Sequence, residues 1–294
     1  MKTIKLIVAI ILIIGVAMTA VGFIAAKGDL TQIVDAFSQD DDYELKNQTG
    51  SEFINQVEIS GSTHSIHLSR SEDANYELTY YEAEYDYFNF SITNGVLILD
   101  NVYKFGPFRW GYKSPAVSLI EVVLPMEFAG SIVASTGTGT IDINDFSALT
   151  ELDLSSGTGS IHISNCQAST AILASTSTGS VSISDCQSLK VDGSTSTGDV
   201  VMDAVNALEI SASCSTGGVE LTDIISDDIS ASSSTGSIIL DIIGVEEDYR
   251  VQVATSTGDI TFQGVEISDQ TLNPAGSKSI IAETSTGSIS INIG

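Results

Sequence analysis

Residues 171–186 read AILASTSTGSVSISDC, and this stretch decides the fold because close variants of it recur along the chain. Apolar and small polar residues alternate on both sides of Thr178-Gly179, which is the period-two pattern of a half-buried β-strand. Thr178-Gly179 and Ser184-Asp185 interrupt this alternation, and Gly and Asp are residues that form turns. The unit is therefore predicted to contain two short strands separated by corners.

A Thr-Gly pair recurs at eight repeat positions between residue 132 and the C-terminus. Its glycines are spaced by 20, 20, 19, 19, 19, 22 and 29 residues and are Gly139, Gly159, Gly179, Gly198, Gly217, Gly236, Gly258 and Gly287. A unit of this size cannot bury its apolar face alone, whereas units stacked as parallel rungs bury a continuous core. The predicted fold class is all-β: a single-chain parallel β-solenoid of 19–20-residue rungs with an N-terminal cap, preceded by one transmembrane helix. An antiparallel sandwich would not need the same pattern eight times.

Several positions around each glycine are predicted to face the core. Apolar residues stand two and four residues after the glycine, and mostly apolar residues stand seven and five before it. A further inner position, seven residues after the glycine, is filled in the first seven units by Phe146, Cys166, Cys186, Val205, Ile224, Ile243 and Val265.

A column of hydroxyl groups is also predicted on the inner face. Three residues before the glycines stand Thr136, Ser156, Thr176, Thr195, Cys214, Ser233, Thr255 and Thr284. Each hydroxyl can bond the backbone or its neighbour, and Cys214 should be a free thiol. Because the outward positions two and four before the glycine are mostly Ser, with Thr inward by parity, an outward Thr array of the ice-binding kind is not expected.

The N-terminal segment predicts a membrane anchor. Leu6–Ala26 comprises 21 consecutive uncharged, mostly apolar residues, and a helix of ~32 Å would cross the hydrocarbon core. Lys2 and Lys5 precede this segment and acidic residues follow it, so the N-terminus is expected in the cytoplasm and the C-terminal domain outside the cell. A cleaved signal peptide is the alternative, although its apolar core would be unusually long. The expected localisation is the cell membrane, with a single pass.

Composition divides the chain into four parts. Residues 1–27 form a cytoplasmic tip and transmembrane anchor, and residues 28–50 form an acidic juxtamembrane stalk. Residues 51–130 form an aromatic-rich N-terminal cap with irregular rungs, in one of which His64 stands where a glycine would be. Residues 131–294 form the regular solenoid. Bulky irregular sequence suits the cap because the open end of a solenoid must be covered.

These features together resemble a bacterial family of β-strand-repeat domains known as putative adhesins. The resemblance rests on residues 120–125 (IEVVLP), on residues 132–143 (IVASTGTGTIDI) and on the repeated STSTG units, and it covers roughly residues 52–294. It implies the repeat fold and attachment at the cell surface, and some relatives look like membrane-anchored accessories of cell-envelope stress operons. It supplies no ligand residues, because the repeats are structural.

Charge and composition exclude several classes of protein. The chain has 38 Asp and Glu against 11 Lys and Arg, a net charge of -27, whereas a nucleic-acid-binding protein needs a basic face. Three widely separated cysteines exclude a disulfide scaffold and a four-Cys zinc site. Gly and Asp do not recur every nine residues, as they do in calcium-binding repeats. No metal site and no cofactor is expected.

Two stacked sets of side chains contain residue types that do chemistry. Asp142, His162 and Ser182 are predicted to stack on one outer face, but no nucleophile elbow or oxyanion hole accompanies them, so no catalytic activity is expected. Cys166 and Cys186 are predicted to stack on successive rungs. Their parallel Cβ vectors make a disulfide awkward, so we interpret them as buried small side chains, with a disulfide as the alternative.

One non-repeating segment contains the candidate contact site. Residues 103–113 read YKFGPFRWGYK and include the only Trp of the chain. Aromatic and Arg side chains are common interface hot spots, and rings flanked by cations also suit anionic lipid headgroups or a glycan. A loop folded over the solenoid end is the alternative. The candidate contact residues are Lys104, Phe105, Phe108, Arg109, Trp110, Tyr112 and Lys113.

The sequence thus predicts an extracytoplasmic, membrane-anchored surface protein, adhesin-like or structural, with no catalytic activity. The alternative is an accessory of cell-envelope stress sensing that binds a membrane partner. The expected partners are a protein or glycan of the envelope or surface and the cell's own membrane through Leu6–Ala26, and not nucleic acid.

Overall fold

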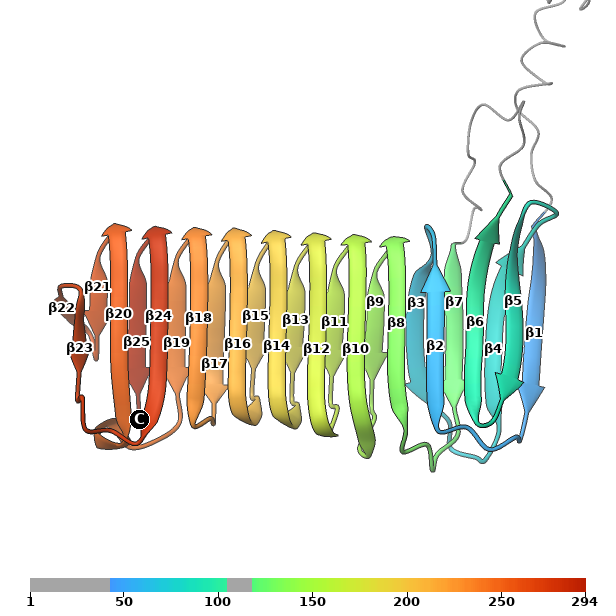
Figure 1. Ribbon diagram of the computed structural model, residues 1–294, viewed down its shortest axis with the longest axis horizontal. Helices are drawn as coiled ribbons and strands as arrows, with labels where there is room; N and C mark the ends of the chain where they lie inside the picture. The colour runs from blue at the N-terminus through green and yellow to red at the C-terminus, as the bar shows by residue number, and fades with distance from the viewer. Residues whose placement is uncertain (1–42, 105–117) are drawn as a thin grey trace, which may run out of the picture.

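Two β-sheets face each other along the length of the molecule (Figure 1). The computed structural model describes residues 43–104 and 118–294. In spatial order, sheet A contains β1 (Glu44–Gly50), β4 (Tyr76–Glu82), β7 (Leu119–Leu124), β3 (Ser65–Arg70), β9 (Ile141–Asn144), β11 (Ile161–Ser164), β13 (Val181–Ser184), β15 (Val200–Asp203), β17 (Val219–Ile224), β19 (Ile238–Ile242), β25 (Ile289–Ile293), β21 (Ile260–Phe262) and β22 (Val265–Ile267). Sheet B contains β23 (Gln270–Leu272), β20 (Tyr249–Thr257), β24 (Lys278–Thr286), β18 (Asp228–Thr235), β16 (Asn206–Thr216), β14 (Gln187–Thr197), β12 (Ala168–Thr178), β10 (Leu149–Thr158), β8 (Ser131–Thr138), β2 (Gln56–Gly61), β6 (Val96–Tyr103) and β5 (Asp86–Thr93). A short 3-10 turn, η1, covers Glu246–Asp248.

Each regular rung contributes one strand to each sheet. The chain runs along a strand of sheet B, turns at the Thr-Gly edge and returns along a strand of sheet A. Neighbouring rungs pair in parallel and in register, so that Leu154 lies opposite Ala174 and Ile161 opposite Val181. The parallel rungs predicted from the repeat are confirmed.

The glycine of the Thr-Gly edge is required by backbone conformation and by space. Seven of these eight glycines have φ between 131° and 149°, a region that side chains with a Cβ rarely adopt. A Cβ on Gly179 would also collide with the carbonyl oxygen of Gly159 on the next rung. The edges of the rungs can therefore stack closely only with glycine at this position.

The second corner uses residues in the left-handed region. Asp145, Asn165, Asp185 and Asp223 have φ between 51° and 67°, which Asn and Asp tolerate better than other residues with a Cβ. Ala204 occupies the same corner with φ of 52° and has no polar side chain to stabilise it.

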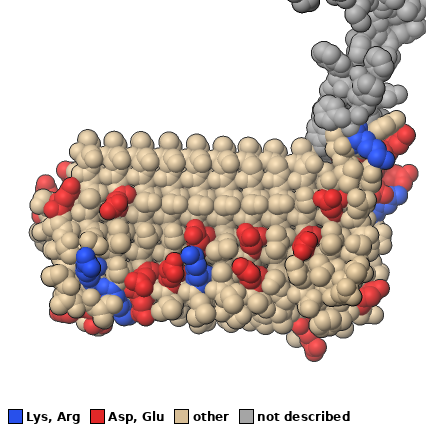
Figure 2. Space-filling model, in the orientation of Figure 1, with Lys and Arg blue, Asp and Glu red and all other residues tan. Residues whose placement is uncertain are grey.

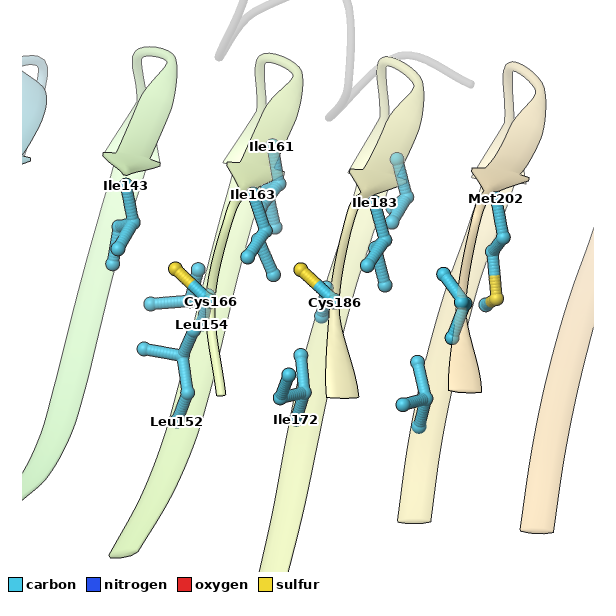
Figure 3. Packing of buried hydrophobic residues seen from close by; sticks show 14 of the residues in the cluster. Ile143, Leu152, Leu154, Ile161, Ile163, Cys166, Ile172, Ile183, Cys186 and Met202 are labelled. Atoms are coloured by element: carbon cyan, nitrogen blue, oxygen red, sulfur yellow. The ribbon is translucent and has the colours of Figure 1, made fainter. Parts of the chain in front are cut away.

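The core lies between the sheets and is continuous from rung to rung (Figure 3). Most of the predicted inner positions are buried, including Leu152, Leu154 and Ile161 of one rung. The prediction is wrong for Ile243 and Val265, which are exposed. The pairing of β17 with β19 shifts register before the corner that follows β19, so Ile242 points inward in place of Ile243. Val265 lies beyond the turn that reverses the chain from β21 into β22.

The predicted hydroxyl column is confirmed, and it bonds the backbone of the adjacent rung. Thr176 Oγ1 donates to the Gly159 carbonyl over 2.9 Å, and Thr195 Oγ1 donates to the Gly179 carbonyl over 2.8 Å. Cys214 is a free, buried thiol in this column. Each bond ties one rung to the next at the Thr-Gly edge.

At both ends of the solenoid the rungs do not stack in sequence order. The last rung, β24 with β25, lies between the rung β18–β19 and the rung β20–β21. At the other end, β2–β3 lies between β8–β9 and β6–β7. The expectation that successive units stack on one another is therefore correct from β8 to β19 and wrong at the ends.

Antiparallel strands terminate the parallel stacks. β1, β4 and β5 do so at the N-terminal end, and β22 and β23 at the C-terminal end. Residues 44–50, assigned to the stalk by composition, thus belong to sheet A as β1. No helix within residues 43–104 and 118–294 is long and apolar enough to cross a membrane, and Leu6–Ala26 lies outside the described residues.

Candidate functional site

Aromatic side chains close the N-terminal end of the core. Tyr76, Tyr80 and Phe88 are buried there, with the Tyr80 and Phe88 rings 4.9 Å apart between centroids. The Phe90 ring packs 6.4 Å from that of Tyr76. The aromatic-rich sequence of this region therefore seals the end of the solenoid, as expected of a cap.

Both ends of the candidate contact segment lie at the Thr-Gly edge of this cap. The Lys104 N–H donates to the Tyr85 carbonyl over 2.7 Å, and the Ser118 carbonyl accepts from the Ser65 N–H over 2.8 Å. Because β6 and β7 flank the segment and belong to one rung, it connects them where other rungs have a Thr-Gly corner. This connection is longer than the corner that joins the two strands of a regular rung.

The first described residue of the chain lies at the same place. The Tyr43 hydroxyl donates to Asp86 Oδ2 over 2.9 Å, and Asp86 follows directly on Tyr85, the partner of Lys104. Asn101 Nδ2 donates to the other oxygen of this buried carboxylate over 2.7 Å. The start of the folded body and both ends of the contact segment therefore meet at one end of the rod (Figure 1).

Of the seven candidate contact residues, the structure places Lys104. It is exposed, and its Nζ lies 4.7 Å from the centroid of the Tyr87 ring, a cation–π contact. The other six lie outside the described residues: Phe105, Phe108, Arg109, Trp110, Tyr112 and Lys113.

His64 is the one fully buried histidine of the described chain. Its ring packs edge-on against Phe88, with 5.1 Å between centroids, and neither ring nitrogen has a hydrogen-bond partner among the described residues. Burial lowers the pKa of His64, and the negative charge of Asp86 opposes this shift in part. The sequence identified the glycine-like position of His64 but could not reveal its environment.

Asp142, His162 and Ser182 stack on neighbouring rungs as predicted. They lie on the outer side of sheet A, where all three are at least partly exposed. His67 precedes Asp142 in the same column. The described residues also contain no group of three or more His, Cys, Asp or Glu side chains arranged to hold a metal ion.

Cys166 and Cys186 are buried free thiols on adjacent rungs. Their Cβ–Sγ bonds point in the same direction (Figure 3), and each Sγ donates to the carbonyl two residues earlier, over 3.2 Å and 3.1 Å. Interaction with the neighbouring Cys166 thiol, together with burial, raises the pKa of Cys186 far above its ordinary value. These features fit the interpretation as buried small side chains.

The sequence analysis missed one exposed feature of the Thr-Gly edge. The threonine directly before each glycine is exposed, although strand parity had suggested that Thr faces inward. Parity fails here because the chain already turns at this residue. The result is a row of exposed threonine hydroxyls along this edge, which is the top of the rod in Figure 2, with exposed Asp199 and Asp259 directly after two of the glycines.

The sequence of residues 54–292 matches the family model described as Toastrack DUF4097. The chain belongs to this family. Among curated proteins, none matches the chain significantly. The resemblance to putative adhesins stated from the repeat motifs is confirmed by the toastrack match.

Three solved structures are similar to this chain over most of its length. A putative adhesin from Bacteroides fragilis is 13% identical, with 85% of this chain and 97% of that chain covered and a TM-score of 0.42. A putative adhesin from Parabacteroides distasonis is 12% identical, with 86% and 98% covered and a TM-score of 0.44. A putative lipid binding protein from the same species is 16% identical, with 86% and 96% covered and a TM-score of 0.33. Similarities this low transfer neither a ligand nor an activity to the toastrack chain.

Proposed function

We propose that this toastrack protein is a single-pass membrane protein whose solenoid lies outside the cell and acts by binding, in an adhesin-like or structural role, without catalysis. The observation that carries the proposal is the shared position of Tyr43, Lys104 and Ser118. Tyr43 follows the apolar segment Leu6–Ala26, while Lys104 and Ser118 stand on either side of residues 105–117, which include the other six candidate contact residues. An anchor and a contact segment that leave one end of the rod would both be close to the membrane.

The same observation favours a second candidate function, an accessory of cell-envelope stress sensing. Residues 27–42 connect the anchor to the body, and even fully extended these 16 residues reach at most about 55 Å. A contact segment held within that distance can reach a membrane protein, a glycan or the lipid surface of its own cell. Its aromatic and Arg side chains are the types that dominate such contacts.

The experiment combines Trp110→Ala with Arg109→Ala in the full-length protein. We expect the double variant to weaken binding to envelope membranes about tenfold, because two hot-spot side chains are removed, and to leave the melting temperature unchanged. The matched control combines Phe53→Ala with Arg70→Ala, which also removes one aromatic and one Arg side chain, but from the described body. Binding to membranes and thermal melting are measured for each.

The outcomes separate the candidate functions. Loss of surface attachment in cells carrying the double variant supports the adhesin-like role, whereas an altered detergent or antibiotic response supports the stress accessory. A fall of many degrees in melting temperature would instead identify the segment as a buried cover of the core. Protection of the solenoid from protease added to intact cells would refute the proposed location.

A further inference from the structure

The corner opposite the Thr-Gly edge carries exposed apolar side chains. Eleven large hydrophobic side chains are exposed among the described residues, and five of them lie at this corner. We call these five residues the corner stripe: Leu189, Leu208, Ile225, Ile243 and Val245, which are 57%, 54%, 44%, 46% and 58% exposed.

The register of the rungs places the corner stripe in two adjacent columns. The β14–β16 ladder places Leu189 beside Leu208, since the two residues that precede them pair with each other. Ile225 pairs with Asn206, two residues before Leu208, and the column of Leu208 continues with Asp227, so Leu208 and Ile225 are diagonal neighbours. The N–H groups of Ile225 and Ile243 each donate to a carbonyl of the preceding rung, over 3.0 Å and 2.8 Å, so these two residues are also neighbours. The stripe therefore crosses four adjacent rungs.

The fold does not require apolar residues at these positions. Gln167, Gln187 and Asn206 occupy the column of Ile225 on other rungs, and all three are exposed. The column is therefore polar on the rungs of Leu189 and Leu208 and becomes apolar at Ile225, without a change in the corner. Exposed apolar side chains that gather on neighbouring rungs and that the fold does not explain mark an interaction surface.

A row of carboxylates runs beside the stripe on its sheet A side. We call it the Asp row: Asp185, Asp203, Asp223 and Asp241, all exposed and each on one of the four rungs. No Lys or Arg occurs in the described corner segments 181–188, 200–207, 219–226 and 238–245. On the sheet B side, Lys190 and Lys278 are already paired with Glu209 and Asp227, each over 3.0 Å. Figure 2 views the rod from its sheet B side, where both acidic and basic side chains lie over the lower half.

We infer that the corner stripe and the Asp row together bind a cationic amphipathic polypeptide segment. Apolar side chains of the segment would cover the stripe, and its Lys or Arg side chains would face the Asp row, which orients the segment and speeds its association. Four rungs at ~4.8 Å span about 14 Å, the length of about ten residues of α-helix.

Electrostatics selects this occupant over two others. An anionic lipid surface would be repelled by the Asp row, and so would a second copy of a chain whose net charge is -27. The inference extends the proposed binding role to a separate surface, and it depends on neither the anchor nor the contact segment. Its test can therefore fail while the proposed function stands.

The test uses the full-length protein in nanodiscs of zwitterionic lipid. The probe is a fluorescent peptide of about twelve Leu and Lys residues with helical amphipathic spacing, titrated by anisotropy against loaded and empty nanodiscs. We expect saturable binding that weakens about tenfold in the variant Leu189→Ser with Leu208→Ser. Asp185→Asn with Asp223→Asn should weaken binding several-fold and flatten its salt dependence, because two charges that attract the peptide are lost. Asn is well tolerated in the left-handed conformation of both positions.

The matched controls make the same kinds of substitution at exposed residues outside the corner stripe and the Asp row. Val133→Ser with Ile239→Ser removes two exposed apolar side chains outside the stripe, and Asp100→Asn with Asp153→Asn removes two carboxylates from sheet B. Both control variants should bind as the parent protein does. Equal weakening in the controls, or equally tight binding of a peptide containing only Lys, would show general charge attraction and overturn the inference. Binding of the protein to anionic vesicles that requires Leu189 and Leu208 would identify a lipid surface instead and would also overturn it.

Discussion

At the scale of single residues, His64 replaces the glycine of the repeat but keeps the backbone hydrogen bond that the glycine accepts on later rungs. Its carbonyl accepts from Thr136 Oγ1 over 2.8 Å, as the glycine carbonyls accept from the hydroxyl column on later rungs. Its ring, however, fills the cap core against Phe88 and has no hydrogen bond among the described residues. A buried imidazole of this kind is stable only while it is neutral.

This environment predicts acid sensitivity of the cap. Because burial lowers the pKa of His64 in the folded protein, the unfolded chain binds a proton more readily, and stability falls as the pH drops below the unfolded value of about 6.5. The loss continues until the lowered pKa is reached, with a slope of at most about 1.4 kcal/mol per pH unit. His64→Leu should remove this part of the pH dependence, as measured by urea unfolding at pH 7.5 and pH 5.5.

His162→Gln provides the matched control for this prediction. His162 lies exposed on the outer face of sheet A, so its replacement should leave the acid sensitivity of the protein unchanged. If His64→Leu and the parent protein lose equal stability between the two pH values, another group titrates and His64 is not responsible.

At the scale of the rung, the corner between β15 and β16 is the weakest of its kind. Ala204 holds φ of 52° where other rungs place Asp or Asn. Ala204→Asn should raise the free energy of unfolding by about 1 kcal/mol, because Asn adopts the left-handed region at lower cost. Thermal melting of the full-length protein measures the gain.

Ala204→Asp separates backbone conformation from charge. Asp is also favoured in the left-handed region, but this side chain would stand between Asp185 and Asp223 on the neighbouring rungs. We therefore expect a smaller gain than with Asn, and one that increases with salt. A loss of stability in the Asn variant would contradict the conformational explanation.

The repeat predicts which side of each element is buried but not which elements are neighbours. Ile161 and Ile163 could be assigned to the core from alternation alone, because a strand exposes alternate residues to opposite faces. The same alternation is compatible with any stacking order, so the place of β24–β25 inside the stack could not be deduced. Ile243 was assigned inward because the corner was assumed to have constant length, and one residue fewer in that corner turns it outward.

The sequence predicts which residues form the candidate site, but not where these residues lie in the fold. Lys104 and the aromatic residues after it stand out because they break the repeat. Their placement beside Tyr43 depends on pairing between strands that are distant in sequence, such as β1 with β4. The corner stripe was missed because its members belong to separate repeats and become neighbours only when the rungs stack.

At the scale of the whole molecule, the rod has two chemically different edges. The Thr-Gly edge carries a row of exposed threonine hydroxyls, and the opposite edge combines the corner stripe with the Asp row. Because each rung contributes one residue to each column, any surface property repeats at ~4.8 Å along the rod. Where one residue differs in type from the others of its column, as Ile225 differs from Gln187 and Asn206, the rod can therefore acquire binding specificity.

Rung order predicts that two deletions of similar size have opposite effects. Deleting residues 180–198 removes one internal rung and joins Gly179 to Asp199, so that equivalent corners meet and β12 can pair with β16. The protein should fold with β-sheet content per residue unchanged, and with a rod about 5 Å shorter by small-angle scattering.

Deleting residues 278–294 instead removes β24–β25 from between β18–β19 and β20–β21. The rung β20–β21 then has no parallel neighbour, so limited proteolysis should cut quickly within residues 246–277. Equal protease resistance of the two deletion variants would mean that β24–β25 stacks at the end of the rod, in sequence order.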